Sequence, residues 1–375
     1  MKQTVIVGMS GGVDSTVAAY LLQQQGYDVR GVFMKNWEDP TEWSGETAAY
    51  RKNRINDCPW EVDLADARAA AEKLGIPFQV MVFVNEYRDL VFTEFVSELK
   101  AGRTPNPDIL CNQEIKFRLF FERALAQEGV DFVATGHYAK IGASADGEYQ
   151  LQKPVDREKD QTYFLHRIDS SVLPRVLFPL QDLTKSEVRK IAAEQGFINA
   201  AKKDSTGICF IGDIDYKTFI DQYIEKKLGN IVLVEADGAR HVIGEHQGLH
   251  FFTIGQRRGI DIGGTGPFYV FEKDLATGDL LVTNDVDDVR LFAKECGVEK
   301  MHWLVSAEDP RVHIGAQFEC EVMIRYRQTP QPATVTVEEG GRIAIAFHTP
   351  ERAVTPGQSA VLYDGDVVLG GGIIS

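Results

Sequence analysis

The sequence has few cysteines, no long apolar run and fewer basic than acidic side chains. Its five cysteines are widely spaced and form no CxxC pair, which argues against a disulfide framework and against a structural zinc site. No stretch approaches the ~18 consecutive apolar residues that a membrane-crossing helix needs. The short apolar run near the start leads into a glycine turn, unlike a signal peptide. These absences predict a cytoplasmic protein whose thiols are mostly free.

The deficit of positive charge bears on partners. Lysine and arginine number 40 against 55 aspartates and glutamates, so the net charge is −15. Taken alone, this balance disfavours nucleic acid, which attracts basic proteins. Net charge does not describe a local groove, however, and basic spots remain at Lys202–Lys203, Arg257–Arg258 and Arg325/Arg327. Such spots are most often solvated surface.

The chain of 375 residues is too long for one ordinary domain. Up to about residue 140, expected strands alternate with expected helices, which predicts an α/β fold with a parallel sheet covered on both faces. After about residue 215, short β segments with frequent glycine predict small barrels or meanders. We expect a catalytic domain over 1–215, a small central domain over 216–287 and a β-barrel-like domain over 288–375.

The individual elements follow from apolar periodicity and from glycines that end helices. The expected strands are Val5–Met9, Val29–Met34, Phe78–Val84 and Phe132–Ala134, and the expected helices are Thr16–Gln25, Val62–Leu74, Tyr87–Lys100, Glu114–Gln127 and Ser186–Gln195. Residues 38–57 are polar and are expected to form a loop or insertion. Ligands of such sheets bind at the carboxyl ends of the strands.

The stretch VIVGMSGGVDS, residues 5–15, joins a strand to a helix through a glycine turn. It lacks the lysine of GxxxxGK[ST] and does not match GxGxxG. Gly11 and Gly12 allow backbone N–H groups to converge on an anion, and the helix adds its positive end. Without a lysine on the γ-phosphate, the loop favours release of pyrophosphate and transfer of AMP. Asp14 would repel phosphate unless it caps the helix or faces Mg²⁺, and we favour Mg²⁺.

Two cysteines lie in polar loops rich in glycine and proline. Cys111 lies in GRTPNPDILCNQEIKF, just before the helix expected from Glu114, and a thiol at a helix N-terminus is expected to have a lowered pKa. Asp108 would raise that pKa, so it fits better as a proton-transfer group for substrate. Cys209 lies in AKKDSTGICFIG, after lysines that could stabilise thiolate or bind phosphate. Taken singly, each cysteine is more often structural than catalytic.

The chain resembles the tRNA-specific 2-thiouridylases, a family of the PP-loop ATP pyrophosphatases, through ten motifs. They occur in the order GMSGGVDS, FMKNW, GRTPNPDILCN, EIKF, ATGHYA, KDQTYFL, KKDSTGICFIG, GEHQGLHFFTIGQRRG, RYRQTP and TPGQSAV. The resemblance covers nearly the whole chain except about residues 38–57. It implies ATP-dependent adenylation of the 2-carbonyl of the wobble uridine, position 34 of tRNA, followed by sulfur transfer from a protein persulfide.

The resemblance also implies partners and site residues. The products would be 2-thiouridine, AMP and pyrophosphate; the partners would be Mg²⁺, tRNA (the acceptors for Lys, Glu and Gln) and a cysteine desulfurase or sulfur-relay protein. Cys209 would carry the persulfide, and Cys111 would release the sulfur through a transient Cys111–Cys209 disulfide or through hydrogen sulfide. Asp108 would be the acid/base. ATP would be bound by Gly8, Met9, Ser10, Gly11, Gly12, Val13, Asp14, Ser15, Met34 and Gly136. The tRNA would be contacted by Asn106, Pro107, Asp108, His137, Lys159, Asp160, Gln161, Arg325, Tyr326 and Gln358.

Two other functions stay open. A PP-loop amidotransferase-type synthetase would use ammonia, and it would need a glutaminase domain or an ammonia channel but neither loop cysteine. A non-catalytic nucleotide- or RNA-binding module would bind ATP without tRNA-dependent release of AMP.

Overall fold

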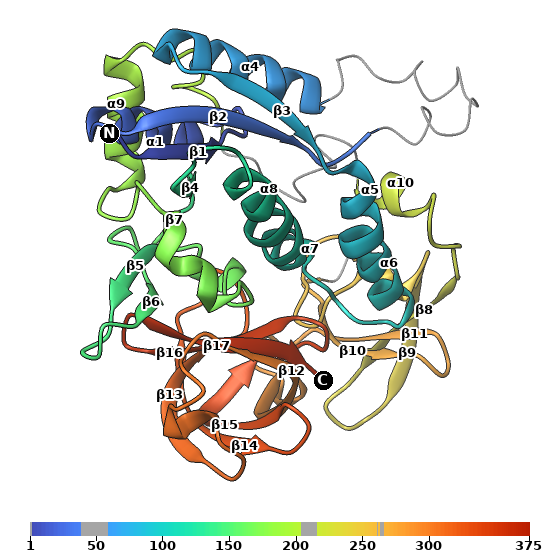
Figure 1. Cartoon of the computed structure of the whole chain (residues 1–375). Coiled ribbons are helices and arrows are strands. Elements are labelled where there is room, and N and C mark those ends of the chain that lie inside the picture. The colour runs from blue at the N-terminus through green and yellow to red at the C-terminus, as the bar shows by residue number, and fades with distance from the viewer. Residues whose placement is uncertain (1, 39–58, 204–215, 261, 263–265) are drawn as a thin grey trace, which may run out of the picture. The chain divides into compact units, whose positions relative to one another are not determined.

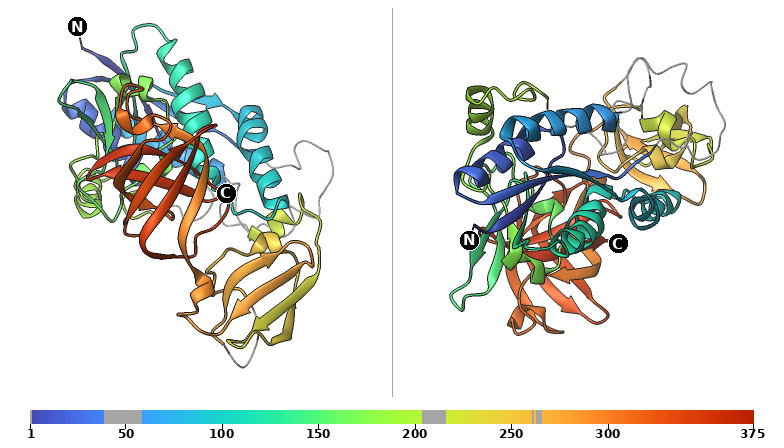
Figure 2. Two further views of the ribbon diagram at one scale, coloured as in Figure 1. Left: turned by 90° about the horizontal axis from the view of Figure 1, so that it is seen from below. Right: turned by 45° about the horizontal axis from the view of Figure 1, so that its top comes forward.

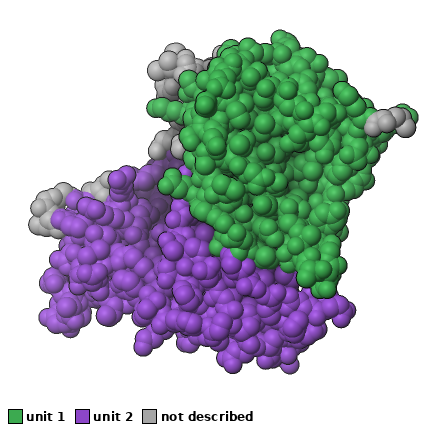
Figure 3. Space-filling view, turned by 90° about the vertical axis from the view of Figure 1, so that its left-hand side faces the viewer, with its two compact units in different colours: residues 1–92, 107–214, 366–368 green, residues 93–106, 215–365, 369–375 purple. Residues whose placement is uncertain are grey.

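The structure is a computed structural model that describes residues 2–38, 59–203, 216–260, 262 and 266–375. Cys58, Cys209 and most of the predicted loop at 38–57 lie outside the described residues. The chain forms two compact units (Figure 3): unit 1 holds residues 1–92, 107–214 and 366–368, and unit 2 holds 93–106, 215–365 and 369–375. None of the described helices is long and apolar enough to cross a membrane.

A five-stranded parallel sheet forms the centre of unit 1 (Figure 1). In spatial order its strands are β3 (Phe78–Val82), β2 (Asp28–Lys35), β1 (Thr4–Gly8), β4 (Phe132–Thr135) and β7 (Val176–Leu177). Every residue of β1 is buried, as expected for a central parallel strand that is covered on both faces. The predicted α/β class is confirmed.

Helices cover both faces of this sheet (Figures 1 and 2). On one face lie α1 (Val13–Gln24) and α4 (Pro59–Leu74), and α9 (Lys185–Glu194) packs against α1. Ala67, Ala70 and Ala71 of α4 recur at helical spacing and bring that helix close to the strands. On the other face, Phe120 approaches Gly8 of β1.

Phe120 belongs to a continuous helix that begins earlier than predicted. It comprises α7 (Pro107–Leu110), the π-helical stretch η2 (Cys111–Phe120) and α8 (Phe121–Leu125). The predicted start at Glu114 is therefore wrong. Pro107 begins the helix because a proline at the first helical position gives up no intrahelical hydrogen bond.

The helix expected at Tyr87–Lys100 also begins earlier, as α5 (Val84–Tyr87), η1 (Arg88–Phe92) and α6 (Thr93–Lys100). The smaller elements of unit 1 are the hairpin β5 (Lys140–Ala143) and β6 (Tyr149–Gln152) and the 3₁₀ turns η3 (Thr162–Phe164) and η4 (Ser170–Arg175). Gln152 of β6 pairs with Val367.

Unit 2 contains a four-stranded sheet after the short helix α10 (Tyr216–Ile220). In spatial order its strands are β10 (Tyr269–Asp274), β11 (Asp279–Thr283), β8 (Gly229–Val234) and β9 (Arg240–His246), with the turn η5 at Leu249–Phe251. Phe252, Ile260 and Phe268 pack on the sheet residues Ile231 and Val282 to form its core.

A closed six-stranded antiparallel barrel completes unit 2, in the order β12-β15-β14-β13-β16-β17. Its strands are β12 (Phe292–Trp303), β13 (Gln317–Met323), β14 (Gln331–Glu338), β15 (Arg342–Arg352), β16 (Ser359–Asp364) and β17 (Val367–Ile374), with turns η6 (Val289–Leu291) and η7 (Pro310–Val312). Pairing of β12 with β17 closes the barrel, which leaves no free strand edge. The predicted C-terminal barrel is confirmed.

Candidate active site

The glycine turn after β1 is held by its own serines. Ser15 Oγ accepts a hydrogen bond from the Ser10 amide at 3.1 Å and donates one to the Gly12 carbonyl at 3.1 Å. Gly11 has φ +78°, and a Cβ there would lie 2.2 Å from the Asp63 carbonyl oxygen. The turn therefore needs glycine at this position, and the first amides of α1 remain directed at the space in front of the helix.

The strand ends beside the turn supply the walls of the candidate nucleotide site. A Cβ at Gly136, just after β4, would lie 2.6 Å from the Ser15 amide nitrogen. A Cβ at Gly8 would lie 3.1 Å from the Met34 methyl carbon at the end of β2. The structure thus brings four of the predicted ATP-binding residues together at the carboxyl edge of the sheet.

Asp14, in the first turn of α1, is paired with a lysine that the sequence did not single out. Lys185 Nζ lies 2.8 Å from both carboxylate oxygens of Asp14, and the Tyr138 hydroxyl donates to the same carboxylate at 3.0 Å. The Lys185 side chain is only 11% exposed. A turn that lacks a lysine in its own sequence therefore has one 171 positions away.

The sequence predicts the helix that carries Lys185, but it does not predict the contact of Lys185 with Asp14. Thr184 and Glu187 form a capping box, which places a helix start at Lys185. Nothing local indicates that the side chain reaches α1. Among the residues that the structure describes, no cluster of three His, Cys, Asp or Glu side chains could hold a metal by itself. A lone carboxylate such as Asp14 suits Mg²⁺ that is also held by phosphate oxygens.

Two residues just before the undescribed segment 204–215 contact the glycine turn. Asn199 is buried and donates to the Gly11 carbonyl at 3.1 Å and to the Thr16 hydroxyl at 2.9 Å. Lys202 Nζ lies 3.4 Å from the same carbonyl and pairs with Asp63 at 2.7 Å. The chain that leads to Cys209 is thereby attached to the turn.

Lys202 also pairs with Asp66, so two carboxylates of α4 face one ammonium group. Partial burial alone would lower the pKa of Lys202, but hydrogen bonds to Asp63 and Asp66 outweigh it and raise the pKa. Lys202 therefore stays charged at neutral pH. Its charge is compensated by α4, a contact that the motif KKDSTGICFIG does not disclose.

Cys111 lies within the helix rather than before it, and its side chain is 1% exposed. Burial raises the pKa of the thiol to about 11; Lys116 opposes this shift and Asp108 adds to it. The predicted lowering of the Cys111 pKa is therefore wrong. Four residues of helix precede Cys111, so the helix start is too far away to offset the loss of water around the thiol.

His137 follows β4 and packs against Phe117 of the helix that carries Cys111. Its Nδ1 lies 2.8 Å from the Thr135 hydroxyl, and its ring lies 5.8 Å from that of Phe117 and 6.3 Å from that of Phe178. Burial, with a smaller effect of Lys116, lowers the pKa of His137 well below its usual value, so the ring is neutral. The charge of Lys116 thus affects the pKa of both Cys111 and His137.

The predicted tRNA-contacting residues Lys159–Gln161 already form internal bonds. Asp160 accepts from the Thr162 amide at 2.9 Å and from its hydroxyl at 2.7 Å. The Gln161 side chain accepts from the Tyr138 amide at 2.9 Å, and the Gln161 amide donates to the Tyr138 carbonyl. These bonds hold the residue whose hydroxyl contacts Asp14.

Of the remaining predicted tRNA contacts, two lie in unit 1, namely Asp108 and the buried Pro107, and the others lie in unit 2. Arg325 is exposed, with Nη2 3.3 Å from the Ile254 carbonyl, and the Arg327 guanidinium lies 5.3 Å from the Tyr326 ring centroid. Gln358 donates to the Thr104 carbonyl at 2.7 Å. Asn106 follows Thr104 by two positions.

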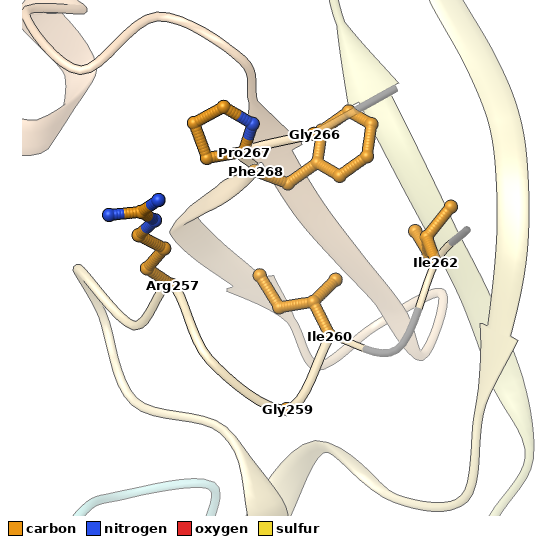
Figure 4. A pocket seen from close by; sticks show the side chains of 7 residues that line it. All are labelled: Arg257, Gly259, Ile260, Ile262, Gly266, Pro267 and Phe268. Carbon is orange, nitrogen blue, oxygen red and sulfur yellow. The ribbon is translucent and has the colours of Figure 1, made fainter. Parts of the chain in front are cut away.

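A cavity of about 310 Å³ lies in unit 2, within the stretch that carries the motif GQRRG (Figure 4). The described residues that line it are Arg257, Gly259, Ile260, Ile262, Gly266, Pro267 and Phe268. Figure 4 shows Ile260 between Arg257 and Ile262.

Family models match the chain in three consecutive segments. The tRNA methyl transferase HUP domain matches residues 3–213, the tRNA methyl transferase PRC-barrel domain matches 217–284, and the aminomethyltransferase beta-barrel domain matches 293–374. The chain is 47% identical to the tRNA-specific 2-thiouridylase MnmA of Lysinibacillus sphaericus, over 99% of this chain and 93% of that protein. It is also 47% identical to the protein of the same name from Proteus mirabilis, over 100% and 97%.

Solved structures resemble the chain only weakly. The NMN synthetase of Francisella tularensis superposes with a TM-score of 0.33 at 17% identity, covering 59% of this chain and 76% of that one. A 4-thiouridine synthetase in complex with RNA and ATP gives 0.30 at 14% identity, covering 54% and 43%. Neither likeness bears on what this chain does.

Proposed function

The chain belongs to the tRNA-specific 2-thiouridylase family, and from this premise we propose that it thiolates the wobble uridine of tRNA. The reaction uses ATP and a protein persulfide and releases AMP and pyrophosphate. The observation that carries the proposal is the attachment of Lys202 and Asn199 to Gly11 of the glycine turn. It puts a stem leading to Cys209, which lies seven positions after Lys202, at a turn suited to phosphate.

The glycine turn and its neighbours fit ATP as a substrate. Glycine at 11 and 136 lets the glycine turn pack against the backbone of α4 and lets the chain after β4 pack against the start of α1. The first-turn amides of α1 can then bind an anion. Gly8–Ser15 would hold the phosphates, and Met34 and Gly136 would line the rest of the nucleotide site. The uridine O2 attacks the α-phosphorus as the bond to pyrophosphate breaks, so AMP becomes attached to O2.

Asp14 is the residue proposed to meet Mg²⁺. Its carboxylate already holds Lys185, so the ion would share it with an ammonium group and would bind mainly through phosphate oxygens. Bound there, Mg²⁺ would neutralise charge on the leaving pyrophosphate. Lys185 and Tyr138 keep the carboxylate fixed in either case.

Sulfur transfer is proposed to start from a persulfide on Cys209. The terminal sulfur attacks C2, the C2–S bond forms, and the C2–O bond breaks as AMP leaves. Cys111 thiolate then attacks Cys209 Sγ, which leaves 2-thiouridine and a Cys111–Cys209 disulfide that two electrons from a reductant restore. In the other route, Cys111 attacks the persulfide first and hydrogen sulfide carries the sulfur to C2.

The raised pKa of Cys111 fits a resolving role better than that of a first nucleophile. With a pKa of about 11, the group stays a thiol at neutral pH and does not compete with the persulfide. Asp108 lies one helical turn before it and is proposed as the acid/base group. The negative charge of Asp108 raises the pKa of Cys111 and so keeps its thiol protonated until the charge around the thiol changes.

Recognition of tRNA is proposed to rest on local positive charge. The candidate contacts are Asn106–Asp108, His137, Lys159–Gln161, Arg325, Tyr326 and Gln358, and we keep the division into 1–215, 216–287 and 288–375, which the three family models support. A cysteine desulfurase or a sulfur-relay protein would load Cys209. A cytoplasmic location is part of the same proposal.

The test is a reconstituted assay with ATP, a persulfide donor and tRNA bearing an unmodified wobble uridine, in which AMP and 2-thiouridine are both measured. Cys209→Ser should abolish 2-thiouridine while tRNA binding is retained. Cys320→Ser, in barrel strand β13, is the matched control and should keep full activity. Thiolation that survives in Cys209→Ser would refute the proposal.

A further inference from the structure

Thr104 is held by the barrel and by the four-stranded sheet of unit 2. Two of the contacts come from the barrel. Its amide donates to the Pro356 carbonyl at 2.9 Å, and its carbonyl accepts from the Gln358 side chain at 2.7 Å. Both partners belong to the turn between β15 and β16 of the barrel. Gly357 of that turn has φ +91°, and a Cβ there would lie 2.7 Å from the Thr104 amide nitrogen. The turn therefore fits closely against Thr104.

A third contact comes from the four-stranded sheet. Lys273 on β10 is half-buried, and its Nζ lies 3.5 Å from the Thr104 hydroxyl and 3.1 Å from the Phe252 carbonyl. Burial lowers the pKa of Lys273 to about 8. Leu275 lies in the turn between β10 and β11, and its side chain would be 2.5 Å from a Cβ at Gly102. The sheet thus contacts the segment directly before and at Thr104.

The chain between Thr104 and the candidate site is short and stiff. It reads Thr104, Pro105, Asn106, Pro107, Asp108, so two of the residues have a fixed φ. Each proline also restricts the residue before it. Fixing Thr104 therefore limits where Asn106 and Asp108 lie.

Resting on the proposed function, we propose that Gln358 is a positioning residue that, with Lys273, clamps Thr104 and so sets where Asn106–Asp108 meet the target uridine. We call Gln358, Lys273 and Pro356 with Thr104 the Thr104 clamp. The barrel and the four-stranded sheet then contribute to catalysis through the clamp, in addition to any contact with tRNA. Gln358 acts through the hydrogen bond from its side-chain amide to the Thr104 carbonyl.

The first experiment compares Gln358→Met with Gln331→Met in the full-length enzyme. Gln331 on β14 is the matched control, because its side-chain amide also donates to a backbone carbonyl, that of Thr329 at 3.0 Å. Hydrogen exchange of the Thr104 amide is followed without tRNA, and kcat and KM for tRNA are measured by thiolation. We expect Gln358→Met to speed exchange at Thr104 and to lower kcat roughly five- to tenfold, with a rise in KM from any lost tRNA contact that is smaller than the fall in kcat. Gln331→Met should change none of these.

The second experiment varies Thr104 itself, which also serves if Gln358→Met does not fold. Thr104→Val removes the hydroxyl that faces Lys273, and Thr104→Ser retains it. We expect kcat to fall in Thr104→Val and to be rescued in Thr104→Ser, with KM for tRNA unchanged in both.

The results that would overturn the clamp differ from those that would overturn the proposed function. A rise in KM with unchanged kcat and unchanged exchange in Gln358→Met would show that Gln358 serves tRNA alone and would overturn the clamp. Equal kcat in Thr104→Val, Thr104→Ser and the unaltered enzyme would overturn the part played by Lys273. If the unaltered enzyme fails to thiolate tRNA, the proposed function fails, and the exchange measurement still decides whether Gln358 holds Thr104.

Discussion

The reactivity of Cys111 is the sharpest quantity that the structure supplies. A pKa of about 11, against an ordinary value of 9.0, leaves about 0.1% thiolate at pH 8 instead of roughly 10%. Since only the thiolate reacts with iodoacetamide, alkylation of Cys111 should be about a hundredfold slower than that of an unburied thiol. The difference of two pKa units corresponds to about 3 kcal/mol favouring the thiol in the folded protein.

The assay alkylates the tRNA-free enzyme between pH 7 and 11 and quantifies the peptide that carries Cys111 by mass spectrometry. The same peptide in urea-unfolded enzyme gives the unburied rate. Two variants change the charge with opposite sign: Asp108→Asn removes a negative charge and should lower the pKa, and Lys116→Gln removes a positive charge and should raise it. Asp108→Asn should therefore be alkylated faster at pH 8, and Lys116→Gln more slowly.

Burial also hinders the reagent sterically, which would slow alkylation without moving its pH dependence. The midpoint of the rate against pH separates the two causes. A midpoint below pH 9, or a shift of both variants in the same direction, would refute the assignment of a raised pKa to loss of water around the thiol. It would also remove the argument that Cys111 resolves rather than attacks first.

The other predictions concern the nucleotide and the tRNA. Asp14→Asn should reduce tRNA-dependent AMP formation about tenfold or more, because the carboxylate that holds Lys185 and that we propose to meet Mg²⁺ is lost; unchanged AMP formation would show that Asp14 serves neither metal nor phosphate. Affinity for tRNA, measured by filter binding, should fall linearly with salt on logarithmic axes although the chain carries a net charge of −15. Binding that ignores salt would contradict a local basic groove.

Local patterns predicted the parallel sheet and the barrel because each depends on short-range rules. β1 is an apolar run buried on both faces, and the barrel strands are short β segments separated by turn signals. The start of the helix that carries Cys111 was misplaced for a local reason as well. The prolines of GRTPNPDILCN indicate a loop, although proline is also favoured at a first helical position, and the misplaced helix start explains the wrong prediction for the pKa of Cys111.

The contacts around the glycine turn could not be predicted locally. Asp14 and Lys185 are 171 positions apart, and Gly11 and Asn199 are 188 apart. Each pair meets only because α9 packs on α1, which depends on the whole sheet being formed. The grouping of residues 93–106 with unit 2 is of the same kind, because the sequence there shows only a helix followed by a proline-rich turn.

The separation of Thr104 from Gln358 has a consequence for synthesis of the chain. The two residues are 254 positions apart, so at about 5–20 residues per second the ribosome delivers Gln358 roughly 13–50 s after Thr104. During that interval the glycine turn and its sheet can form, but the segment before Asp108 lacks its barrel partner. Under the proposed function, a nascent chain would therefore acquire the turn proposed to hold ATP before it acquires the clamp proposed to present the uridine.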